Sequence, residues 1–142
     1  MSVRLSHTFV AGRSPGIVLV HGLGADGGCF AAAPRLLSGG HALLIPDLAG
    51  FGKTSVVPRD FSFAMMDQAD LVWALCEEKG LKEIILVGHS MGGAIAILMA
   101  ESRPGRVTHL ADAVGNLVAE DAFYSRRIVS QGWAEFRARG FE

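Results

Sequence analysis

Short continuous apolar runs alternate along the chain with longer segments whose apolar residues recur at helical spacing. The runs at residues 17–20, 42–45, 84–87 and 107–114 have the length and composition of strands buried on both faces. Residues 62–79 keep a helical period and end at a glycine. Strands that alternate with helices favour right-handed crossovers. The pattern therefore predicts a three-layer α/β fold with a doubly wound, mostly parallel sheet.

The remaining segments are shorter or less regular. Residues 3–10 alternate weakly and predict an edge strand, followed by a turn at residues 12–16. Residues 26–37 predict one short helix, which a glycine pair ends. Residues 120–139 are amphipathic and predict one or two helices. These last helices either pack on the sheet or begin a lid.

The segment Gly88-His89-Ser90-Met91-Gly92-Gly93 follows the apolar run 84–87 directly and precedes a helix-forming run. A strand that enters a helix through G-x-S-x-G makes a sharp elbow, which holds the serine hydroxyl clear of both elements. Gly88 and Gly92 are expected where a Cβ would collide with the neighbouring strand or helix. Ser90 is therefore the candidate nucleophile. The alternative is a Gly/Ser turn that merely ends a buried strand.

Composition narrows the class of protein. The chain has 142 residues, of which 50% are hydrophobic and 19% charged, and its net charge is −1. This balance gives no basic surface for nucleic acid and no polybasic membrane anchor. No apolar run approaches the roughly 18 residues of a membrane span, and the start has no signal-peptide core, so we expect a cytosolic protein. Cys29 and Cys76 lack metal-ligand or C-x-x-C spacing, and we expect reduced, structural thiols and no metal or cofactor.

Three glycine motifs compete for interpretation. Residues 22–27 read G-x-G-x-x-G after a strand, with Asp47 20 residues further on, which is also the layout of a dinucleotide-binding fingerprint. Gly52-Lys53-Thr54 resembles the end of a phosphate-binding loop, but the pattern needs a glycine where Asp47 stands and a helix directly afterwards. The third interpretation takes His21-Gly22-Leu23-Gly24 as half of an oxyanion hole, in which the main-chain N–H groups of Leu23 and Met91 bind the developing charge.

Three segments together resemble the α/β-hydrolase fold family. They are Leu19-Val20-His21-Gly22-Leu23-Gly24, Pro46-Asp47-Leu48-Ala49-Gly50-Phe51-Gly52-Lys53-Thr54-Ser55 and Val87-Gly88-His89-Ser90-Met91-Gly92-Gly93. The resemblance implies a serine hydrolase that transfers the acyl group of a small ester-like substrate, with motif support from His21, Gly22, Gly88, His89 and Gly92. It also implies a partial core over residues 1–116 and the start of a cap or lid over residues 117–142. A serine at position 90 argues against the relatives that use an aspartate nucleophile.

The family order of nucleophile, acid and histidine is incomplete here. After Ser90 the only histidine is His109, inside a predicted strand, and Glu101 lies about 16 Å along a helix at 1.5 Å per residue. Asp112 and Asp121 could stand near the site as an acid, but without a histidine the serine stays a weak nucleophile. We therefore expect a chain truncated after the sixth strand of that fold and the start of its lid.

Two consequences follow from this expectation. The strand at residues 107–114 would present an exposed parallel edge, which predicts a homodimer that pairs along it. The alternative function is a non-catalytic fragment that keeps the centre of the fold and serves as a binding or interaction module.

Overall fold

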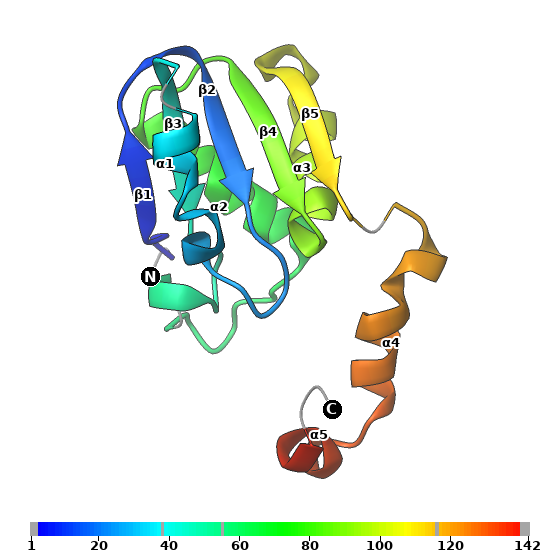
Figure 1. Cartoon of the computed structure of the whole chain (residues 1–142). Helices are drawn as coiled ribbons and strands as arrows, with labels where there is room; N and C mark the ends of the chain where they lie inside the picture. Colours follow the sequence, from blue (N-terminus) through cyan, green and yellow to red (C-terminus); the bar gives the residue numbers. More distant parts are fainter. Residues whose placement is uncertain (1–2, 38, 55, 116, 140–142) are drawn as a thin grey trace.

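The structure of the chain is a computed structural model that describes residues 3–37, 39–54, 56–115 and 117–139. Within these residues it holds five strands and five α-helices, joined by loops and short 3-10 helices (Figure 1). The strands are β1 (His7–Val10), β2 (Arg13–Val20), β3 (His41–Pro46), β4 (Ile84–His89) and β5 (Val107–Ala113). The α-helices are α1 (Ala33–Leu36), α2 (Met65–Glu78), α3 (Met91–Ser102), α4 (Phe123–Ser130) and α5 (Trp133–Arg139). The 3-10 helices are η1 (Gly27–Phe30), η2 (Gly52–Thr54), η3 (Pro104–Arg106) and η4 (Ala119–Ala122).

All the described strands form one sheet in the order β1-β3-β2-β4-β5. β1 runs antiparallel to β3, and every other pairing is parallel, which confirms the predicted sheet. β4 lies between β2 and β5, and Gly88 near its end pairs with Val20 on one side and with Asp112 on the other. The carboxyl ends of these three strands therefore meet at one edge of the sheet, where ligand sites of open α/β sheets lie.

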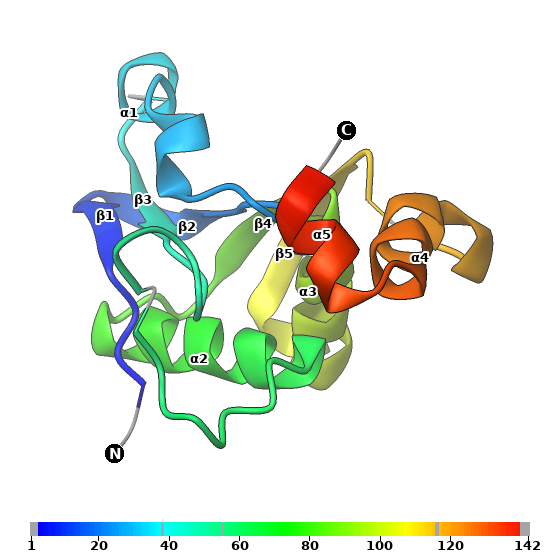
Figure 2. The same cartoon turned by 90° about the horizontal axis from the view of Figure 1, so that it is seen from below.

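The main core lies between the sheet and the layer formed by α2 and α3. Figure 2 shows both helices on one face of the sheet and α1 on the other. Large side chains from both layers are fully buried there: Val18, Leu44, Ile84, Leu86, Trp73, Ile95 and Met99. A smaller cluster on the opposite face joins Leu19, Leu43 and Ile45 to Phe30 and Ala33. Because the strands are covered on both faces, their sequences read as continuous apolar runs.

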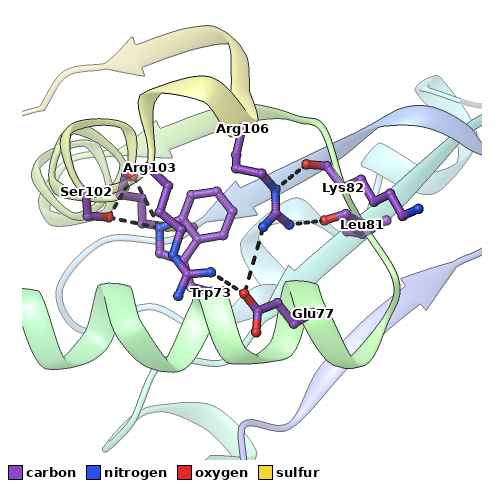
Figure 3. Close-up of polar contacts among 8 residues, drawn as sticks. Trp73, Glu77, Leu81, Lys82, Ser102, Arg103 and Arg106 are labelled. Atoms are coloured by element: carbon purple, nitrogen blue, oxygen red, sulfur yellow. Dashed lines mark hydrogen bonds and ion pairs between the residues drawn. The ribbon is translucent and has the colours of Figure 1, made fainter.

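A polar cluster around Trp73 ties α2 to the end of α3 and the start of β5 (Figure 3). The buried indole Nε1 donates hydrogen bonds to the Met99 carbonyl and to Ser102 Oγ, both at 3.2 Å. The guanidinium carbons of Arg103 and Arg106 lie 5.0 Å and 5.3 Å from the ring centroid of Trp73, within cation–π range. Both arginines also pair with the carboxylate of Glu77. The cluster satisfies the indole N–H at the edge of the core.

Two expectations about local structure were wrong. Residues 13–16 of the turn predicted at residues 12–16 belong to β2, whose pairing with β3 shifts register between Arg13 and Ile17. Such an irregular ladder tolerates a proline, which cannot donate a hydrogen bond. The helix predicted over residues 26–37 is broken into η1 and α1. Adjacent glycines weaken the first half as a helix, and Pro34 stands in the first turn of the second.

The C-terminal segment is helical, as the sequence predicts, and it divides into α4 and α5. Figure 1 shows these helices extending beyond the carboxyl edge of the sheet rather than packing on it. In the described residues β5 pairs only with β4, and Leu110 is 41% exposed. Within the same residues, we find no helix with the length and apolar character needed to span a membrane.

Candidate active site

Ser90 stands between the end of β4 and the start of α3, and its backbone is strained. Its φ of 54° and ψ of −122° lie in a region that non-glycine residues rarely adopt. Two main-chain hydrogen bonds hold this conformation: the Ser90 N–H donates to Ala113 O at 3.0 Å, and the Gly93 N–H donates to Ser90 O at 2.8 Å. The strand–helix elbow predicted from the sequence is therefore present.

The glycines on either side of Ser90 are sterically required. A Cβ on Gly88 would lie 2.5 Å from Gly93 Cα, and a Cβ on Gly92 would lie 2.6 Å from His21 O. Real Cβ atoms do not approach backbone atoms so closely. The elbow can therefore form only with glycine at both positions.

The Ser90 side chain is half-buried and makes no capping hydrogen bond to α3. The hydroxyl thus stays available at the N-terminal end of a helix of 12 residues. The unpaired amides at such an end favour negative charge close by. These amides would stabilise negative charge that develops on an oxygen close to the Ser90 hydroxyl during a reaction.

The loop after β2 packs directly against the elbow. A Cβ on Gly22 would lie 3.0 Å from Ser90 Cβ and 3.1 Å from His89 O. The Leu23 side chain is 47% exposed. In the described part of the chain, the Leu23 N–H donates to no main-chain acceptor, and the Met91 N–H, at the first residue of α3, has no acceptor one turn earlier in the helix. The geometry thus leaves two free amides in the two segments that meet at Ser90.

The sequence profile of the alpha/beta hydrolase fold matches residues 15–141, which is most of the chain. The chain belongs to the alpha/beta hydrolase fold family.

Several curated proteins are similar to this chain in sequence. The chain is 36% identical over 90 residues to the magnesium-chelatase 30 kDa subunit of Rhodobacter capsulatus, covering 63% of this chain and 31% of that protein. It is 39% identical over 95 residues to lipase 1 of Psychrobacter immobilis, covering 66% of this chain and 29% of the lipase. The chain thus spans about a third of the length of these relatives.

The fold is also found among solved structures. A thermophilic esterase from Thermogutta terrifontis superposes with a TM-score of 0.74 at 28% identity. The match covers 96% of this chain and 50% of the esterase. The fold of this α/β-hydrolase chain is therefore that of a larger enzyme over about half of the enzyme's length.

Asp47 has a structural role in this α/β-hydrolase chain. Its Oδ1 accepts the N–H of Gly27 at 2.8 Å, and its Oδ2 accepts the N–H of Lys53 at 2.9 Å. In a dinucleotide site this carboxylate would bind the ribose. Here both of its oxygens already accept main-chain N–H groups from two loops of the chain. Gly24, with φ of +72°, serves the tight turn closed by Ala25 N–H and Gly22 O. These contacts give the G-x-G-x-x-G pattern a structural explanation.

The phosphate-loop interpretation also fails. Lys53 lies in the three-residue helix η2, and after it the next described helix is α2, which begins only at Met65. A phosphate-binding loop leads directly into a helix.

In the described residues no histidine forms a hydrogen bond with the Ser90 hydroxyl. His21 is fully buried, and both its ring nitrogens make hydrogen bonds, to Gly22 O and Leu48 N. His109 pairs with Ile85, four residues before His89 along β4, or roughly 13 Å from the elbow at about 3.3 Å per residue. His41 begins β3, and its Nδ1 bonds Pro15 O at 2.7 Å near the opposite edge of the sheet.

The other two histidines are His89, the last residue of β4, and His7, the first residue of β1. His89 is exposed, and its Nδ1 lies 3.2 Å from the place of a Cβ on Gly22. His7 begins β1, which is separated from β4 by β3 and β2.

The carboxylates named from the sequence have different surroundings. Asp121 accepts the N–H groups of Leu117 and Val118 at 2.8 Å and 2.9 Å, and these bonds, that of Val118 first, lower the pKa of its carboxyl. Asp121 therefore caps η4. Asp112 lies beside the elbow: its Cγ is 2.9 Å from the place of a Cβ on Gly93, and its buried Oδ1 has no hydrogen-bond partner in the described residues. Glu101 lies near the far end of α3.

Sequence reasoning named His21 only as motif support and gave it no contacts. Its partner at Nε2, the Leu48 N–H, lies 27 residues away, so no local pattern reveals the bond. The one available signal is a histidine that continues the buried run of β2 just before a glycine.

Proposed function

We propose that this chain carries the nucleophile and the oxyanion-binding groups of a serine hydrolase acting on small esters. Ser90 Oγ attacks the carbonyl carbon of the substrate while a general base takes the hydroxyl proton, so that the carbon becomes tetrahedral and the carbonyl oxygen becomes an oxyanion. The N–H groups of Leu23 and Met91 bind that oxygen. Collapse of this intermediate leaves the acyl group on Ser90 and expels the alcohol, which takes the proton from the base. The single observation that carries the proposal is the strained backbone of Ser90, whose side chain makes no capping hydrogen bond to α3 and against which Gly22 packs.

The energetic contribution of the two amides is large. Each preorganised donor to an oxyanion contributes roughly 3 to 4 kcal/mol of transition-state stabilisation. Both donors belong to rigid backbone: Met91 is the first residue of α3, and Leu23 lies in the turn closed by Ala25. They therefore need little reorganisation when charge develops.

Gly22 limits the side from which a general base can approach Ser90. Gly22 occupies the flank toward β2, and β4 separates β2 from β5 in the sheet. The remaining flank faces β5 and the helices beyond it. We propose that the histidine and its acid approach from this flank and come from sequence outside these 142 residues, and that residues 117–142 begin a lid.

Ester chemistry is supported by the relatives. One relative is named a lipase, and one similar solved structure is named an esterase. The substrate proposed is accordingly a small molecule with an activated or ester-linked acyl group.

A fluorophosphonate probe tests the proposal, with intact mass as the readout. We expect one adduct on the native chain, none on Ser90→Ala, and an unchanged adduct on Ser130→Ala, which removes an exposed serine hydroxyl on α4. Added imidazole should accelerate labelling, because it replaces the missing base. An adduct that persists in Ser90→Ala would reject the nucleophile.

A second candidate is a non-catalytic binding module. The arrangement of the five histidines favours it, as does a relative named as a subunit of a chelatase. Absence of labelling with and without imidazole would support the module. Hydrolysis of a chromogenic ester by this chain alone, lost in Ser90→Ala, would instead show that a base is present.

A further inference from the structure

His21 is a fully buried histidine whose two ring nitrogens reach two different loops. It follows the last residue of β2 and is 0% exposed. Nδ1 lies 2.9 Å from the carbonyl oxygen of Gly22, and Nε2 lies 3.0 Å from the main-chain nitrogen of Leu48. The ring also makes an edge contact with Phe51, with centroids 5.6 Å apart.

These contacts select one protonation state. The Leu48 nitrogen can only donate, so Nε2 must accept and carries no proton. The Gly22 oxygen can only accept, so Nδ1 carries the proton and donates it. A neutral ring protonated at Nδ1 therefore satisfies both partners.

The bond to Gly22 O determines where the next amide points. The carbonyl of Gly22 and the N–H of Leu23 belong to one planar trans peptide, in which they point in opposite directions. The Gly22 oxygen is held by His21 Nδ1 and, at 3.3 Å, by the Ala25 N–H. The Leu23 N–H is thereby turned to the other side of that peptide, and Gly22 itself lies against Ser90.

We infer that His21 is a positioning residue that aims the Leu23 amide at the oxyanion formed on Ser90. The inference rests on the proposed function and gives His21 a role in that same site. His21 touches neither substrate nor nucleophile and acts only through the Gly22–Leu23 peptide.

The other end of the imidazole supplies rigidity. Leu48 begins a loop that is already fixed on two sides, by Asp47 to Gly27 and by the Gln68 side chain to both main-chain groups of Ala49. His21 thus connects the oxyanion loop to a segment that cannot shift with it. A hydrogen bond at Nδ1 alone would orient the peptide without anchoring the ring.

Two variants separate these functions, because each keeps one of the two bonds. In His21→Asn the amide nitrogen is attached to Cγ, as Nδ1 is, and can still donate to Gly22 O. In His21→Gln the amide oxygen reaches toward the position of Nε2 and can still accept from Leu48. Each variant loses one buried hydrogen bond, so we expect similar losses of stability in urea unfolding.

The rate of fluorophosphonate labelling should differ between them. We expect His21→Asn to label within about threefold of the native chain. We expect His21→Gln to label about 10- to 100-fold more slowly, because complete loss of one oxyanion donor costs about 100-fold or more and a misdirected donor loses part of that effect. Equal rates in two folded variants of equal stability would overturn the inference and leave the nucleophile intact.

A spectroscopic test does not depend on any reactivity of Ser90. Nitrogen-15 NMR of the native chain should show the His21 ring proton on Nδ1 and none on Nε2. Dipolar couplings should show the Leu23 N–H vector unchanged in His21→Asn and reoriented in His21→Gln. A ring protonated at Nε2, or an unchanged Leu23 vector in folded His21→Gln, would reject the positioning role even if Ser90 labels normally. If neither variant folds, the ring tautomer of the native chain decides.

Discussion

Ser90 donates its main-chain N–H to the carbonyl oxygen of Ala113 at 3.0 Å, so the last residue of β5 holds the backbone of the candidate nucleophile. The strained conformation of Ser90 is thus maintained from outside β4 and α3. Strain of this kind persists only where the surrounding structure fixes it. β5 is therefore part of the site through its backbone, and it also carries Asp112 beside the elbow.

Substitution of Gly92 by alanine should destabilise the protein. The added Cβ would meet His21 O at 2.6 Å, and backbone cannot move aside as a side chain can. We expect a loss of roughly 1–3 kcal/mol or more in urea unfolding, together with loss of fluorophosphonate labelling. Gly105→Ala is the matched control, because a Cβ there meets nothing within 4 Å. Equal stability of the two variants would contradict the steric account of the elbow.

Arg106 should matter more to stability than Arg103, although both lie over Trp73 and pair with Glu77. Arg106 also donates to the carbonyl oxygens of Leu81 and Lys82, which precede β4. We expect Arg106→Ala to cost about 1–3 kcal/mol and Arg103→Ala less than about 1 kcal/mol, since partly exposed ion pairs contribute little. Thermal or urea unfolding of both variants measures the difference. The reverse order would show that the ring contacts dominate.

The two cysteines should differ in reactivity. Burial raises the pKa of the Cys76 thiol from 9.0 to about 12, whereas Cys29 is exposed and burial raises its pKa by less. At pH 8 we expect a thiol reagent to modify Cys29 in the folded protein and Cys76 only after denaturation. Modification of Cys76 at the rate of Cys29 would show that α2 opens readily.

The same pKa shift predicts a dependence of stability on pH. The folded state holds the Cys76 proton more tightly than the unfolded chain, so its contribution is complete below about pH 9 and is lost between pH 9 and about 12. The free energy of unfolding of the native chain should fall across this range. In Cys76→Ala the fall should be smaller by the part that this thiol contributes.

The open edge of β5 should make the chain self-associate. Val107–Ala113 includes no lysine or proline that would discourage pairing, and Leu110 is 41% exposed. We expect light scattering to give the mass of a dimer, and Ala111→Lys to give that of a monomer. Val129→Lys places the same charge on exposed α4 and should leave the dimer intact. A strictly monomeric native chain at high concentration would reject this interface.

Sequence reasoning succeeded where structure depends on neighbouring residues. The buried strands and Ser90 between two glycines are local patterns, because parallel strands exclude polar residues and a tight elbow excludes side chains at fixed positions. It failed where a long-range partner decides. Pro15 and Gly16 resemble a turn, yet pairing with β3 draws them into β2. The bonds of His21 depend on Leu48 in another loop, and no periodicity reports them.

The contact between Gly92 and the carbonyl of His21 leaves no room for even one methyl group. The start of α3 and the segment that follows β2 are therefore packed too closely to shift independently, so the proposed nucleophile and the proposed amide donors should keep their mutual spacing. Under the proposed function, selection among acyl chains of different size must then depend on residues outside these two segments. Engineering of substrate scope should accordingly vary residues after Val114 and leave the two segments unaltered.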